Sequence, residues 1–148
     1  MALWFDDLHV GLSFTSATYT LTADEVIAFA RQYDPQPFHT DDAAARETLF
    51  GGLAASGWHT AAISMKLLVG DGAPFEGGII GSGGELAWPR PTYPGDTLRV
   101  VWEITELTPS RSRPDRGMVK IRMETRNQNN EIVQVFSPRL VVPRRPNS

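Results

Sequence analysis

The chain has 148 residues, of which 41% are hydrophobic and 21% charged, and its formal net charge at pH 7 is −3. This length and composition are typical of one globular domain, here residues 1–148, that buries a core of its own. The slightly negative charge argues against a nucleic-acid partner, which needs a basic surface. The absence of cysteine excludes disulfides, thiolate nucleophiles and cysteine metal sites, and it fits a reducing compartment.

The N-terminal sequence, Met-Ala-Leu-Trp-Phe-Asp-Asp, is acidic and lacks the charged-then-apolar order of a signal peptide. No apolar run is long enough to span a bilayer. We therefore expect a cytoplasmic protein that does not act at a membrane.

The first elements are predicted to be a strand and a helix. Residues 13–21 alternate and are rich in Thr, Phe and Tyr, as expected for a half-buried strand. Thr22 then begins a capping-box pattern with Glu25 three residues later. Apolar residues follow at helical spacing, which predicts a helix over residues 23–33. A short helical turn is expected within residues 41–47.

A longer central helix is predicted to start at Ser56-Gly57 and to end at Gly70. Its apolar residues recur at intervals of three and four, and we expect the stripe that they form to pack against a sheet, with the tryptophan in the core. This stripe comprises Trp58, Ala61, Ala62, Met65, Leu68 and Val69.

The second half of the chain predicts a series of strands. Alternating apolar residues indicate strands at 97–107, 118–126 and 131–142, and another near residues 78–80. The glycine-dense residues 71–84 are expected to be partly a lid and partly the start of that strand, with Gly81-Ser82-Gly83-Gly84 as a turn or a close backbone approach. Because no helix separates the later strands, we predict the α+β class: an antiparallel sheet with one long helix across one face.

The segment from Tyr33 to Asp41 contains a carboxylate, Asp34, and an imidazole, His39. Two prolines, Pro35 and Pro37, lie between them. Proline lacks a backbone donor and restricts the residue before it, which predicts a stiff, non-helical loop. Such a loop can hold two reactive side chains in place. The alternative is a simple helix-ending turn in which Asp34 is a cap and His39 is solvated.

Acid–base chemistry suits these residues better than the other chemistries that we considered. Ser56 lacks the surroundings of a nucleophile elbow, and no phosphate-binding or dinucleotide-binding loop is present. A metal site could be drawn from His39, Asp41, Asp42 and His59, but we predict none. Adding or removing water requires a group that polarises the water and one that delivers a proton, as Asp34 and His39 could. The N-terminus of the central helix, at Gly57, could stabilise an oxyanion.

Three motifs occur in order: Asp34-Pro-Gln-Pro-Phe-His39, then Ser56-Gly57 at the start of a helix, then Glu85-Leu-Ala-Trp-Pro-Arg-Pro-Thr-Tyr-Pro-Gly-Asp96. In combination they resemble the MaoC-like dehydratases, relatives of the (R)-specific enoyl-CoA hydratases, over roughly residues 10–142. The resemblance implies the hot-dog fold, with an antiparallel sheet wrapped around the central helix. Many members of that family have Asn where Gln36 stands and His-Gly where Ser56-Gly57 stands.

The resemblance also implies a function in fatty acid metabolism: hydration of a trans-2-enoyl-CoA thioester, or dehydration of the (R)-3-hydroxyacyl-CoA. Asp34 and His39 would be the catalytic residues, and Gly57 with Ser56 would bind the substrate at the oxyanion site. No cofactor is expected, because the coenzyme A thioester is the substrate. The implied assembly is a homodimer or a dimer of dimers. A non-catalytic acyl-CoA-binding module and an acyl-CoA thioesterase remain alternatives.

The implied mechanism requires a bend in the backbone, and several other side chains have two possible roles. The chain between Asp34 and His39 must bend, near Pro37-Phe38, for both side chains to reach one water. Phe75 and Trp88 could line an acyl pocket or pack in the core. A set of arginines could contact the phosphates of coenzyme A or be solvated: Arg90, Arg111, Arg113, Arg116 and Arg126.

Overall fold

The computed structural model describes residues 2–72 and 75–146, with only the backbone for residues 71 and 72, so part of the predicted lid lies outside the described residues. The strands are β1 (Ser13–Thr20), β2 (Ile80–Ala87), β3 (Thr97–Pro109), β4 (Arg116–Arg126) and β5 (Ile132–Pro143). The helices are α1 (Ala23–Tyr33), α2 (Pro37–Thr40), α3 (Asp42–Ala45) and α4 (Gly57–Leu67). A 3-10 turn at Phe5–Asp7 precedes β1, and a π-helical turn at Leu68–Gly72 extends α4.

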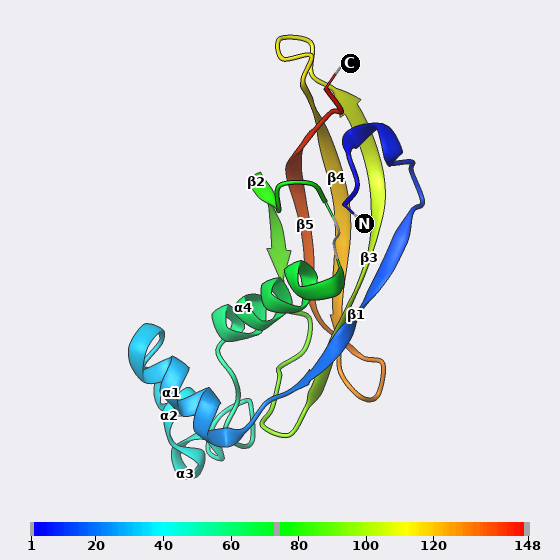
Figure 1. Cartoon of the computed structure of the whole chain (residues 1–148). Coiled ribbons are helices and arrows are strands. Elements are labelled where there is room, and N and C mark those ends of the chain that lie inside the picture. The colour runs from blue at the N-terminus through cyan, green and yellow to red at the C-terminus, as the bar shows by residue number, and fades with distance from the viewer. Residues whose placement is uncertain (1, 73–74, 147–148) are drawn as a thin grey trace.

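The five strands form one antiparallel sheet in the order β1-β3-β4-β5-β2. Helix α4 lies across one face of this sheet, and α1, α2 and α3 form a separate group near one end of it (Figure 1). This is the hot-dog fold, so the predicted fold class is confirmed. Among the described helices, none has both the length and the apolar character needed to cross a membrane.

The core lies between α4 and the central strands. Alternate residues of β3 and β4 are buried, because successive side chains of a strand point to opposite faces. These buried residues are Leu98, Val100, Trp102, Ile104, Val119, Ile121 and Met123. Phe75, one of the two candidates for an acyl pocket wall, is only 5% exposed and packs on Trp102 with ring centroids 5.4 Å apart. Phe75 is therefore a core residue.

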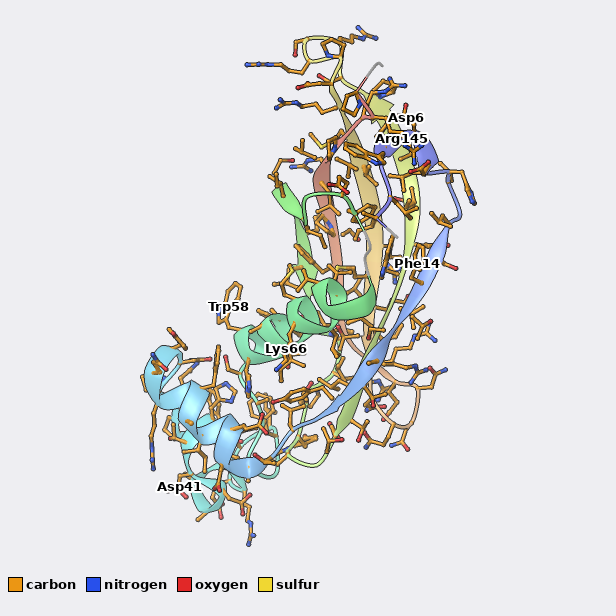
Figure 2. The ribbon with its side chains drawn as sticks, in the orientation of Figure 1. Asp6, Phe14, Asp41, Trp58, Lys66 and Arg145 are labelled. Atoms are coloured by element: carbon orange, nitrogen blue, oxygen red, sulfur yellow. The ribbon has the colours of Figure 1, made fainter. Side chains whose placement is uncertain are left out.

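The apolar stripe predicted for the central helix was assigned to the wrong face. Trp58, predicted to be in the core, is 59% exposed and projects from α4 away from the sheet (Figure 2). Met65 and Val69 are also exposed, and of the predicted stripe only Leu68 is buried. The buried face of α4 carries Ile63 and Leu67 together with polar residues. Ser64 of that face is hydrogen-bonded to the carbonyl of Thr60 and to the Thr125 hydroxyl. Polar side chains satisfied in this way can be buried at little cost.

The glycines at residues 81–84 belong to β2 and do not form a turn, so that alternative was wrong. The other alternative, a close backbone approach, is confirmed at Gly84. A Cβ atom there would lie 2.6 Å from the Cα of Pro138 on the neighbouring strand β5. Glycine at this position lets β2 pair closely with β5.

Candidate functional site

Helix α1 ends at Tyr33, as predicted, and only residues 34–36 separate it from the next helix, α2. Thr22 caps the start of α1 by accepting a hydrogen bond from the Glu25 amide. After Asp34, the Gln36 amide donates to the Asp34 carbonyl over 2.8 Å. Pro37 then begins α2, where its missing donor costs nothing because the first amides of a helix have no internal partner. The segment is thus partly helical, contrary to the sequence prediction.

This turn brings the acid and the imidazole together. The Nε2 atom of His39 lies 3.5 Å from Oδ2 of Asp34, and the two side chains are 6% and 17% exposed. The other ring nitrogen, Nδ1, lies 2.6 Å from the carbonyl oxygen of Ala54. Since a carbonyl only accepts, Nδ1 carries the proton of that hydrogen bond. Nε2 is therefore the nitrogen that can exchange protons next to Asp34, and His39 is buried rather than solvated.

The environment of Asp34 favours its ionised form. Burial raises the pKa of this carboxyl, but hydrogen bonds from Gln36 and Ser56 and the attraction of His39 together lower the pKa to below its ordinary value. Gln36 donates to Oδ1 over 2.6 Å, and Ser56 donates to Oδ2 over 2.7 Å. At neutral pH Asp34 is therefore a carboxylate with both oxygens held.

A cavity of about 260 Å³ opens at the N-terminal end of α4. Its lining consists of His39, Phe50, Ala55, Gly57, Thr60, Trp88, Pro89, Arg90, Pro91 and Thr92. His39 and Gly57 both face this space, so the imidazole and the start of the helix are available to one bound molecule. Apolar side chains such as Phe50, Ala55 and Trp88 form part of the wall around them.

Gly57 is the first residue of α4, and among the described residues its amide has no hydrogen-bond partner. A Cβ atom at this position would lie 2.6 Å from the indole of Trp88. That indole is held in place because its Nε1 donates to Oε1 of Gln134 over 2.9 Å. Glycine therefore allows the Trp88 indole to lie close against the start of α4, at the cavity that both residues line. A free amide at a helix N-terminus can stabilise negative charge.

Ser56 does not lie with Gly57 at the cavity, although both residues were expected to bind the substrate at the oxyanion site. Ser56 is fully buried and does not line the cavity. Its hydroxyl donates to Asp34 and accepts from the Trp58 amide, which makes it the N-cap of α4. The hydroxyl is thus directed at the carboxylate rather than at the space for a ligand.

The residues considered for a metal site point in separate directions. Asp41 caps α3 by accepting from the amides of Ala43 and Ala44, and Asp42 accepts from the Leu53 amide. His59 stacks on Phe29 with ring centroids 4.5 Å apart, and burial lowers the pKa of its imidazole, partly opposed by Glu25. In the part of the chain that the structure describes, no three His, Asp or Glu side chains are grouped to bind a metal ion.

The comparison with known proteins identifies the family. The family model described as "MaoC like domain" matches residues 10–127. The chain belongs to this family.

A solved MaoC-like dehydratase from Rhodospirillum rubrum is 54% identical to this MaoC-like chain, with a TM-score of 0.97 over 99% of this chain and 100% of that one. The R-hydratase PhaJ1 from Pseudomonas aeruginosa is 26% identical, with a TM-score of 0.78 over 97% and 88% of the two chains. A 3-hydroxybutyryl-CoA dehydratase from Methylorubrum extorquens is 32% identical over 112 residues, which are 75% of this chain and 69% of that protein. Together these matches support a hydratase or dehydratase activity in general.

Several residues of this MaoC-like site were not singled out from the sequence. The backbone carbonyl of Ala54 orients the His39 ring through a hydrogen bond to Nδ1. Because every residue has such a carbonyl, the sequence does not indicate which one forms this bond. Gln36 holds Asp34 from within the proline segment. Thr92 lines the cavity, and its buried hydroxyl has no partner among the described residues. The proline-rich residues 89–94 were the available signal for this wall of the cavity.

Among the arginines that could bind phosphate, one lies at the cavity. Arg90 lines it, with Nη1 2.9 Å from Oε2 of Glu131. Arg126 is paired with Glu124 instead. The remaining arginines lie in or next to the β3–β4 connection, at the end of the sheet opposite α1–α3 (Figure 1).

Proposed function

We propose that this protein is a hydro-lyase that adds water to trans-2-enoyl-CoA thioesters and, in reverse, removes it from (R)-3-hydroxyacyl-CoA. The observation that carries the proposal is the approach of His39 Nε2 to within 3.5 Å of Asp34 Oδ2, next to a cavity that Gly57 at the start of α4 also lines. Two similar proteins, an R-hydratase and a 3-hydroxybutyryl-CoA dehydratase, support the substrate class.

In the proposed reaction Asp34 and His39 hold one water between them. Oδ2 of the carboxylate accepts hydrogen bonds, and so does Nε2 in the neutral ring form whose proton is on Nδ1, so a water can donate to both. The water oxygen bonds to C3 of the enoyl group and loses a proton, while C2 gains one. These protons pass through Asp34 and His39, which are close enough to exchange them, so the pair supplies both the general base and the general acid.

Attack at C3 moves negative charge onto the thioester oxygen. We place that oxygen at the Gly57 amide, where the N-terminus of the eleven-residue helix α4 adds a favourable dipole. Trp88 and Phe50 would then lie against the acyl group. Arg90 is our candidate for contact with a phosphate of coenzyme A. The proposed chemistry needs no cofactor, because the thioester activates its own double bond.

We further propose that the protein acts as a homodimer or as a dimer of dimers. Strand β2 is at one edge of the sheet, and Ile80 of that strand is 60% exposed. Trp58 and Met65 on α4 are exposed as well. A second copy could cover these apolar side chains and extend the sheet.

The first test replaces Asp34 with Asn, which keeps the shape and removes the charge. We expect hydration of crotonyl-CoA, measured as loss of enoyl absorbance, to fall by about 10²–10⁴-fold, the usual contribution of general acid–base catalysis. Binding of crotonyl-CoA to this variant, measured by calorimetry, should be retained. Asp24→Asn, at an exposed position in the first turn of α1, is the matched control and should leave turnover unchanged.

Three outcomes would contradict the proposal. Full activity of Asp34→Asn would remove Asp34 from the mechanism. Release of free coenzyme A thiol by the wild-type protein, without hydration, would identify a thioesterase. Binding of enoyl-CoA without any turnover would identify a non-catalytic acyl-CoA-binding module.

A further inference from the structure

Ser56 connects the start of helix α4 to the Asp34 carboxylate. Its hydroxyl oxygen accepts a hydrogen bond from the Trp58 amide over 3.2 Å, and its proton is donated to Asp34 Oδ2 over 2.7 Å. Ser56 is 0% exposed, so water does not compete for either bond. Hydrogen bonds that share one hydroxyl in this way polarise each other and strengthen the chain that they form.

Helix capping alone does not account for this arrangement. An N-cap serine stabilises a helix through its oxygen, which accepts from an early helix amide. The hydroxyl proton is not needed for the cap, and it could point in other directions. In this structure it points to Asp34, a residue 22 positions earlier in the chain.

The Asp34 carboxylate has two hydrogen-bond donors, and they differ in their surroundings. Gln36, which holds Oδ1, is an exposed residue, whereas Ser56, which holds Oδ2, is fully buried. Oδ2 is also the oxygen that lies 3.5 Å from His39 Nε2. The bond from Ser56 therefore fixes the oxygen that faces the imidazole.

We infer that Ser56 is a positioning residue, whose buried hydroxyl keeps Oδ2 of Asp34 directed at the space beside His39 Nε2. This inference rests on the proposed function. Ser56 does not contact the substrate and acts through Asp34 alone. Since a hydrogen bond to a carboxylate favours the charged form, Ser56 also sets the pH below which Asp34 loses its charge and the enzyme its base.

Few other titratable groups near Asp34 could shift the pKa of its carboxyl. The titratable group that faces Asp34 is His39, from α2. Helix α4 contributes the uncharged Ser56, while His59 of that helix is turned to Phe29 and Glu25 of α1. The effect of removing the serine hydroxyl should therefore be read directly in the titration of Asp34.

The experiment compares Ser56→Ala and Ser56→Gly with the wild-type protein. The pKa of the Asp34 carboxyl is followed by carbon-13 NMR, and the acid limb of the kcat/KM profile is followed with crotonyl-CoA. We expect both to move to higher pH by about one unit, because a bond to a charged group is removed. Ser56→Gly separates this effect from helix capping, since glycine at an N-cap costs only about a few tenths of a kcal/mol relative to serine.

Ser64→Ala is the matched control. Ser64 is a second buried serine of α4, 1% exposed, but its hydroxyl is bonded to Thr60 and Thr125 rather than to Asp34. This variant should lose stability without a shift in the acid limb or in the Asp34 titration.

The inference is overturned if the Asp34 titration is the same in wild type, Ser56→Ala and Ser56→Gly, in which case Ser56 is a helix cap and nothing more. The NMR readout needs no substrate. If the wild-type protein fails to hydrate any enoyl-CoA, the proposed function fails, while the titration still decides whether Ser56 controls Asp34.

Discussion

Asp34 and His39 are five residues apart, and the shape of the chain between them decides whether they can share a water. A fully extended segment would separate their Cα atoms by about 15 Å, too far for two side chains to meet. The helical turn α2 shortens this path and brings the side chains to 3.5 Å. The bend that the mechanism demands is therefore present, and Pro37 starts it.

At the same scale, Gly57 is expected to be intolerant of a side chain. In Gly57→Ala the new Cβ would lie 2.6 Å from Trp88, whose indole cannot easily move because Gln134 holds it. We expect kcat/KM with crotonyl-CoA to fall by about tenfold or more, because displacing Trp88 by even 1 Å would disturb the proposed oxyanion site. Gly70→Ala is the control, since a Cβ at Gly70 meets no atom within 4 Å. Equal activity of the two variants would show that the indole yields freely.

At the scale of elements, helix α4 and strand β2 each have one side packed against the rest of the chain and one side exposed. The inner face of α4 buries Ile63 and also Ser64, which is hydrogen-bonded to Thr125 of β4, while its outer face leaves Trp58 exposed. Strand β2 pairs with β5 on one side and is at the edge of the sheet on the other. Each of the two elements therefore has one side that packs within this chain and one side that a second copy of the chain could cover.

Glycine in β2 is expected to matter at one position and not at another. In Gly84→Ala the Cβ would clash with the backbone of Pro138 and Ser137, which cannot rotate away. We expect a loss of about 1–3 kcal/mol in the free energy of unfolding, as for overpacking elsewhere. Gly81→Ala, in the same strand with no atom within 4 Å of its Cβ, should be close to neutral. Denaturant unfolding of both variants measures the difference, and equal midpoints would contradict the close approach of β2 to β5.

At the scale of the whole molecule, the exposed apolar side chains of α4 and β2 support the proposed dimer. Ile80→Glu would put a charge at the free edge of the sheet, where burial of an unpaired carboxylate is costly. We expect this variant to sediment as a monomer of 16.3 kDa and the wild-type protein at two or four times that mass. Val10→Glu is the control, because Val10 is 61% exposed, like Ile80 at 60%, but lies outside the strands. A wild-type monomer would contradict the proposal.

The sequence by itself determined the order and type of most elements, because that information is local, but it missed the short helix α2 and most of strand β2. The cap at Thr22, the end of α1 before Pro35 and the alternation through Trp102 and Ile121 each follow from neighbouring residues. The three motifs at Asp34–His39, Ser56-Gly57 and Glu85–Asp96 in combination also indicated the family without coordinates. Patterns of this kind depend on the period of a helix or strand and on the geometry of proline.

Only the tertiary structure decided which face of α4 is buried and where each site residue points. An apolar stripe shows that a helix face is to be covered, but it does not say by what, and the sheet covers the face of Ser64 rather than that of Trp58. The roles of Ser56 and Trp88 depend on contacts with residues more than twenty positions away, Asp34 and Gln134. Contacts at that separation are set by how the helices and the sheet pack, and no local pattern encodes them.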